Sequence, residues 1–188
     1  MRDTTEGAGA LTQWLPATLV ELRIEQGRLS EARQLAARLP LRTRGRRITG
    51  AWLRARIQRA AGDTAGASAS LETAMRAFLA ERKPTVTLMS LPLVSAAEWR
   101  LAAGDARGAD SLARLARTVA ARRDTLALTR SVFVGRAELV DARALRALGD
   151  TAGARRAAAR AVVAFGNGYG SASPWTRGAH ALLDTLSR

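Results

Sequence analysis

The sequence predicts an all-α protein made of four helix-turn-helix pairs and a closing helix. The phrase GDTAGA occurs at residues 62–67 and again at 149–154, with GDARGA at 104–109 and GRLSEA at 27–32. Each copy lies between two Ala-, Leu- and Arg-rich stretches whose apolar residues recur at helical spacing. Aromatic residues make up only 4% of the chain, so we expect thin core layers between closely packed helices, as in helical solenoids.

The repeated phrase predicts a hinge between two antiparallel helices. Its first residue, such as Gly62, supplies the left-handed backbone conformation that ends a helix without a Cβ clash. Asp63, Asp105 and Asp150 are expected to accept hydrogen bonds from the free N–H groups of the next helix. The last residue of the phrase lies one turn into that helix, where close approach of two helices requires a small side chain. These alanines are Ala32, Ala67, Ala109 and Ala154.

The first two pairs are predicted at residues 10–40 and 43–82, after a small and polar tail at 1–9. Ser30 is a candidate N-cap for the second helix of the first pair, and Pro40 ends that helix because proline cannot continue it. The apolar stripes of the first helices are Leu11, Trp14, Leu15, Leu19, Leu22 and Ile24, and then Ile48, Trp52, Leu53 and Ile57.

The last two pairs are predicted at residues 85–122 and 125–165 by the same spacing of apolar residues. Pro92 suits the first turn of a helix that begins near Ser90. An extended segment is the alternative for Val86–Met89, where strand-forming residues gather.

A Gly-rich segment, GNGYGSAS at 166–173, predicts a break after the fourth pair. Pro174 then begins a closing helix at 174–187, which has no further helix to pack against and is expected to cover the end of the array. Residues 10–188 are therefore expected to form one helical domain.

The chain is strongly basic, with 30 basic residues, 16 acidic residues and a formal net charge of +14. Such a charge favours an acidic partner, and nucleic acid is one such partner, although no element that reads bases is evident. Lys83 is the only lysine, and this bias toward arginine is also typical of GC-rich genomes. Codon usage is therefore a second explanation for part of the charge.

Several classes of protein and site are disfavoured by the sequence. It has no cysteine, which excludes disulfides and thiolate metal sites. The N-terminus lacks the pattern of a signal peptide, and no stretch of 18 apolar residues is uninterrupted by charge. We therefore expect a cytoplasmic protein without a membrane span.

Residues capable of chemistry are few. His180 is the single histidine, and Asp184 follows one helical turn later, but no nucleophile or metal ligand accompanies them, so a solvated histidine is the simpler interpretation. The Gly-rich segment lacks the strand and the Lys-Ser/Thr of a phosphate loop, which favours a connector. The hinge aspartates recur in separate hinges and are better explained as caps than as an acid–base pair. We expect no catalysis, no cofactor and no metal.

The glycines that begin the four hinges are separated by 35, 42 and 45 residues, a spacing typical of repeat proteins. Small residues recur seven positions before them, and mostly Ala twelve positions after them. The first set is Val20, Ala55, Ala97 and Ala142, and the second is Leu39, Ala74, Ala116 and Ala161. On these residues the units resemble tetratricopeptide repeats, which implies a right-handed α-solenoid of about four helical pairs with a capping helix.

The chain departs from that family in one position. The family's aromatic residue four positions before the glycine is replaced by Arg23, Gln58, Arg100 and Leu145. The longer spacing and the ending Gly170-x3-Pro174-x-Thr176 are similar to the repeats of kinesin light chains and of bacterial regulators. In bacterial signalling proteins such arrays form the C-terminal part of a larger chain, and this chain is a candidate for such a part.

The resemblance implies that the first helix of each pair lines a concave groove that binds a partner. Carried over residue by residue, the candidate groove residues are Trp14, Glu21, Trp52, Arg56, Arg59, Glu98, Arg136, Arg143 and Arg146. A groove with apolar residues and several arginines suits a peptide with acidic and hydrophobic side chains. For Trp14 and Trp52 the alternative is burial in the core.

We therefore expect a non-catalytic scaffold for protein–protein interaction. The alternative is a basic helical-repeat protein that binds nucleic acid through an arginine-rich face. Self-association through the ends or the Ala-rich faces of the array is a further possibility.

Overall fold

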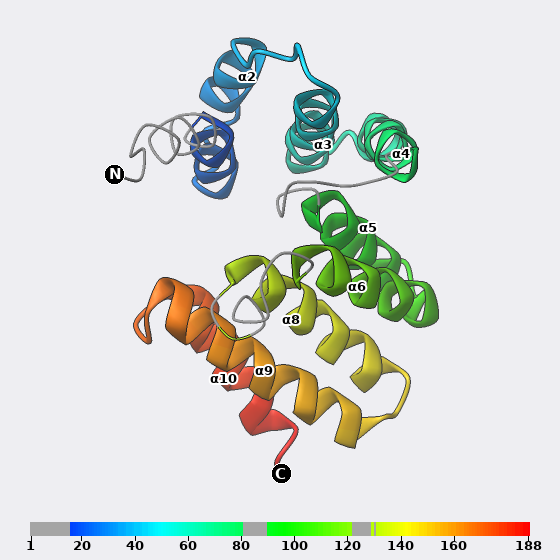
Figure 1. Ribbon diagram of the computed structural model, residues 1–188, viewed down its shortest axis with the longest axis vertical. Coiled ribbons are helices and arrows are strands. Elements are labelled where there is room, and N and C mark those ends of the chain that lie inside the picture. Colours follow the sequence, from blue (N-terminus) through cyan, green and yellow to red (C-terminus); the bar gives the residue numbers. More distant parts are fainter. Residues whose placement is uncertain (1–15, 81–89, 122–128, 130) are drawn as a thin grey trace, which may run out of the picture. The chain divides into compact units, whose positions relative to one another are not determined.

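The computed structural model describes residues 16–80, 90–121, 129 and 131–188. All regular secondary structure within these residues is helical, which confirms the all-α prediction for this part of the chain (Figure 1). The predicted tail at 1–9 and the alternative for Val86–Met89 lie outside the described residues. None of the described helices combines the length and the apolar character that a membrane span requires.

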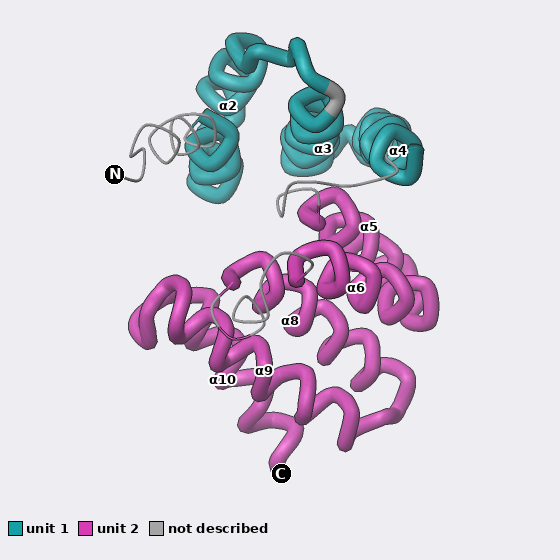
Figure 2. The backbone as a smooth tube through the Cα atoms, viewed as in Figure 1, with its two compact units in different colours: residues 1–82 teal, residues 83–188 magenta. Residues whose placement is uncertain are grey.

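The chain divides into two compact units, residues Met1–Arg82 and Lys83–Arg188 (Figure 2). The boundary falls between the second and the third predicted pair. The first unit contains helical residues 16–25, α2 (Leu29–Ala37), α3 (Arg44–Ala60) and α4 (Thr64–Leu79). Within this unit α3 packs along α4, and α2 contacts α3.

The second unit contains five labelled helices. They are α5 (Ser90–Ala102), α6 (Ala106–Ala121), α8 (Val132–Ala147), α9 (Thr151–Tyr169) and α10 (Pro174–Thr185). Each helix packs against the next one in this order, and α5 also contacts α8 (Figure 1). The second unit is therefore a stack in which helices that are close in the sequence are also neighbours in space.

The hinges have the local structure that the repeated phrase predicts. The glycines Gly27, Gly62, Gly104 and Gly149 all have positive φ, between 71° and 86°. Asp63, Asp105 and Asp150 each accept a hydrogen bond of 2.8 Å from the backbone N–H three residues later. The four small hinge residues Ala32, Ala67, Ala109 and Ala154 are fully buried. The structure thus confirms the predicted helix end at each glycine, the aspartate N-caps and the close helix contact at each alanine.

The hinge also explains the second glycine of the phrase. A Cβ on Gly66, Gly108 or Gly153 would lie 2.2 Å from the Oδ2 atom of the capping aspartate. Glycine at this position therefore lets the carboxylate lie directly over the first turn. In the divergent copy, Ser30 lies inside α2, so its predicted capping role was wrong. Arg28 and Glu31 form an ion pair there, with Nε and Oε1 2.7 Å apart.

Polar side chains four positions before three of the hinge glycines contact the hinges. Arg23 Nε lies 3.1 Å from Glu31 Oε2, and Arg100 Nη1 lies 3.0 Å from Asp105 Oδ2. In the second hinge, Gln58 Nε2 donates to Asp63 Oδ2 at 3.3 Å. The backbone N–H of Gly108, followed by the Arg100 guanidinium, lowers the pKa of Asp105. In these three hinges the side chains therefore tie the first helix to the start of the second.

The predicted break at 166–173 begins too early, because α9 continues through Tyr169. The Phe165 and Tyr169 rings stack along the helix with centroids 6.0 Å apart, and Asn167 Nδ2 donates to the carbonyl of Thr129 at 2.7 Å. These contacts compensate for the weak helix propensity of Gly166 and Gly168. The chain turns at Gly170, where φ is 86°.

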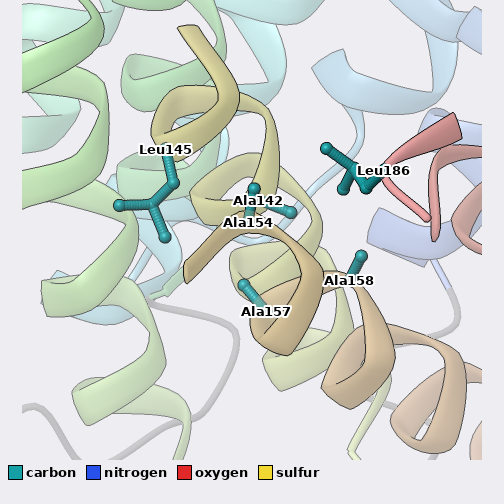
Figure 3. Packing of buried hydrophobic residues seen from close by; sticks show 6 residues of the cluster. All are labelled: Ala142, Leu145, Ala154, Ala157, Ala158 and Leu186. Atoms are coloured by element: carbon teal, nitrogen blue, oxygen red, sulfur yellow. The ribbon is translucent and has the colours of Figure 1, made fainter. Parts of the chain in front are cut away.

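The closing helix α10 begins as predicted, with Ser173 Oγ accepting from the Thr176 N–H at 3.0 Å. It packs against α9. Leu186, just beyond its end, joins the apolar cluster formed by Ala142, Leu145, Ala154, Ala157 and Ala158 of α8 and α9 (Figure 3). The small side chains of this cluster allow the two helices to approach closely, and the leucines of the last turn fill the remaining space.

Candidate partner-binding site

The predicted groove residues of the first unit are largely engaged with one another. Arg56 Nη1 lies 3.3 Å from Glu21 Oε1, and the Arg56 guanidinium lies 5.9 Å from the centre of the Trp52 ring. Trp52 is only 1% exposed, so it is a core residue and its assignment to a partner-binding surface is corrected. Arg59 is half-buried on the same helix, α3. Trp14 lies outside the described residues.

The predicted groove residues of the second unit separate into a buried and an exposed set. Arg136 is 6% exposed, and its guanidinium lies 4.8 Å from the centre of the Trp175 ring, a cation–π contact. Because α10 supplies this ring, the closing helix covers Arg136. The prediction that Arg136 contacts a partner directly was therefore wrong. Arg143 and Arg146 are exposed, and Glu98 of α5 is half-buried.

Arg143 and Arg146 remain as an exposed basic pair. They lie three residues apart on α8, so their side chains extend from the same face of the helix. Neither makes an ion pair within the parts of the chain that the structure describes. Guanidinium groups that form no ion pair with a described residue keep their hydrogen-bond donors available for an external carboxylate.

The structure also contains a charged cluster that the sequence did not predict. Glu138 of α8 is 1% exposed, and its carboxylate binds the Arg160 guanidinium of α9 in a bidentate manner, with Nε–Oε1 at 2.7 Å and Nη2–Oε2 at 2.8 Å. Arg117 Nη1 of α6 lies 3.3 Å from Glu138 Oε1. One buried carboxylate thus connects three helices, and it raises the pKa of Arg160 through its hydrogen bonds.

A second carboxylate, Asp141, lies one turn further along α8 and is also buried. Arg114 of α6 lies 2.8 Å from Asp110 and 4.0 Å from Asp141. Burial raises the pKa of Asp141 to about 7, and the hydrogen bond with Asp110 and the charges of Asp110 and Glu138 act in the same direction. Arg114 opposes these effects only in part, because it is shared with Asp110.

This cluster connects α6, α8 and α9 through charged contacts. Glu138 and Asp110 accept hydrogen bonds from arginines, whereas Asp141 lies 4.0 Å from Arg114. No group of three potential metal ligands occurs among the residues that the structure describes. A signal for the cluster was present in the sequence. Glu138 and Asp141 interrupt the apolar stripe of the fourth pair at a spacing of three, and Asp110, Arg114 and Arg117 share one face of α6.

The other residues considered for chemistry are His180 with Asp184, the hinge aspartates and the glycines of the Gly-rich segment. His180 and Asp184 are both exposed on α10. The three hinge aspartates cap three different helices, as the hydrogen bonds described above show. The residues Gly166 and Gly168, considered for a phosphate loop, are helical.

A comparison of the chain with family models, with curated proteins and with solved structures finds no match.

Proposed function

We propose that the chain is a non-catalytic scaffold for protein–protein interaction. In this proposal it is a right-handed α-solenoid of about four tetratricopeptide-like pairs with a capping helix, and it binds an acidic segment of a partner protein. The recurrent hinges support the repeat architecture, since the buried alanine returns in all four hinges and the aspartate cap in three of them. Stacked pairs of this kind present an extended surface that needs little ordering before it binds.

The observation that carries the proposal is the exposed pair Arg143 and Arg146 on α8. In the same helix Glu138 and Asp141 are buried and engaged with arginines of α6 and α9 or with Asp110. The acids of α8 therefore lie inside, while two of its arginines point outward without a described partner. This arrangement suits a helical partner segment with carboxylates three or four residues apart. It also suits an extended partner segment with carboxylates on alternate residues.

The test is a selection of peptides from a random display library on the immobilised chain. Selected peptides are then titrated in solution against the wild type, the variant Arg143→Glu/Arg146→Glu and a control, Arg155→Glu/Arg156→Glu. The control reverses the same number of exposed charges on the neighbouring helix α9. We expect acidic peptides whose affinity falls about tenfold or more in the α8 variant, and much less in the control.

The same titrations distinguish the alternative of nucleic-acid binding. Single- and double-stranded oligonucleotides of random sequence are added in place of the peptide at low and at high salt. Affinity that is lost steeply with salt, and equally in both double variants, indicates binding to phosphates by overall positive charge. That result, together with a peptide selection that shows no enrichment of acids, would contradict the scaffold proposal.

A further inference from the structure

The first unit contains a pocket of about 410 Å³ between α2 and α3. Its lining residues are Arg33, Ala36, Ala37, Leu41, Gly50, Arg54, Ile57 and Gln58. The space exists because small residues meet there, with Ala36 and Ala37 on α2 and Gly50 on α3. Leu41 closes one side, and it lies so near to Gly50 that a Cβ on this glycine would be 2.7 Å from Leu41 Cδ2.

The lining of the pocket is apolar between two arginines. Ile57 is 5% exposed and Leu41 is 38% exposed, so the apolar part includes both a buried and an accessible portion. Gln58 has its amide engaged already, because it accepts from Ser70 Oγ at 2.6 Å and donates to Asp63 at 3.3 Å. The polar groups left in the lining are therefore the guanidinium groups.

Arg33 and Arg54 are exposed, and neither forms an ion pair or a side-chain hydrogen bond with another described residue. Other arginines of this unit do have acidic partners, as Arg28 has Glu31 and Arg56 has Glu21. No aspartate or glutamate lines the pocket. The two guanidinium groups thus raise the electrostatic potential of an apolar cavity, and no ion pair with a described residue neutralises them.

We propose that this pocket binds a peptide segment of a partner protein in which carboxylates flank a large apolar side chain. The apolar side chain enters the cavity against Ala36, Leu41 and Ile57, and the carboxylates accept hydrogen bonds from Arg33 and Arg54. A bare inorganic anion matches the charge but leaves the apolar lining wet, whereas an acidic and apolar segment satisfies both. The inference rests on the proposed scaffold function and adds a site in the first unit, separate from Arg143 and Arg146.

The test uses three fluorescein-labelled decapeptides and fluorescence anisotropy. In the first, glutamates flank a leucine and a phenylalanine; in the second, glutamines replace the glutamates; in the third, alanines replace the leucine and the phenylalanine. The proteins are the wild type, Arg33→Glu, Arg54→Glu and Ala36→Phe, which fills the cavity without a change of charge. Arg38→Glu and Arg47→Glu are matched controls, because both residues are exposed nearby but do not line the pocket.

We expect the wild type to prefer the first peptide, and each of the three pocket variants to weaken this binding about tenfold or more. The two control variants should change it less than about threefold, since a rim charge has a smaller effect. Far-UV circular dichroism establishes that every variant is folded. The arginine variants keep the test decisive if Ala36→Phe fails to fold.

Four results would overturn the inference. An equal loss in all four arginine variants indicates diffuse attraction by charge, and unchanged binding in a folded Ala36→Phe excludes insertion of the apolar side chain. If only Arg143→Glu/Arg146→Glu, titrated in parallel, weakens binding of the peptide, the pocket is excluded as the binding site but the scaffold function is not. If neither this peptide nor any selected acidic peptide binds, both proposals fail.

Discussion

Substitution of Arg160 by alanine should destabilise the second unit more than removal of its buried partner, Glu138. Arg160→Ala removes two short charge-assisted hydrogen bonds from a carboxylate that is 1% exposed, and leaves it with Arg117 alone at 3.3 Å. A buried charge that loses a partner costs about 3–5 kcal/mol. Because Arg160 itself is 45% exposed, its interaction is partly screened, and we expect about 3 kcal/mol.

Glu138→Leu should be milder, at about 1 kcal/mol, because it removes the buried charge itself. The two arginines that lose their partner are 34% and 45% exposed, so both can turn toward water. The double variant should then be about as stable as Glu138→Leu alone, which corresponds to a coupling free energy of about 3 kcal/mol.

Urea unfolding followed by far-UV circular dichroism measures all four proteins of this cycle. The asymmetry between the two single variants is the critical result. If Glu138→Leu costs as much as Arg160→Ala, or if the two losses add in the double variant, the argument that burial of the carboxylate dominates this cluster is wrong.

Three further predictions concern the second unit and are measured by the same urea unfolding. The pKa of Asp141 is raised to about 7 in the folded state. The contribution of Asp141 to stability is therefore greatest below its ordinary pKa and falls as the pH rises toward 7. Asp141→Asn should be more stable than the wild type at pH 8 but not at pH 4. An equal difference at both pH values would contradict this sign. Asp150→Ala removes the N-cap of α9 and should cost about 1 kcal/mol, whereas Asp184→Ala on the exposed side of α10 should cost much less. Gly135→Ala places a Cβ 2.8 Å from the Phe165 ring and should cost about 1–3 kcal/mol; an unchanged midpoint would show that the ring moves freely.

Much of the fold could be predicted because the hinge chemistry is local. The glycine that ends one helix, the aspartate that caps the next and the alanine that is buried after it lie within six residues, as from Gly149 to Ala154. Their interactions need no knowledge of distant parts of the chain. The closing helix at Pro174 was predictable for the same reason, since its N-cap is the adjacent Ser173.

The candidate site was predicted less well, because exposure depends on which helices are neighbours. Arg136, Arg143 and Arg146 all follow one helical pattern, yet only Arg136 is covered by Trp175 of α10. Glu138 and Asp141 were not predicted to be buried because charged residues are usually exposed. The pattern used to predict the core consists of apolar residues and therefore does not include them.

The amino-acid sequence by itself determined the helices, the hinges between them and the excess of positive charge, because propensity, capping and composition act over a few residues or over the chain as a whole. The tertiary structure alone decided which charges are neutralised. Glu138 and Asp141 meet arginines of α6 and α9 only when α8 lies against these helices. Burial and pairing of a charge depend on residues 20 or more positions away, and for that reason the arginines left for a partner are visible only in the folded chain.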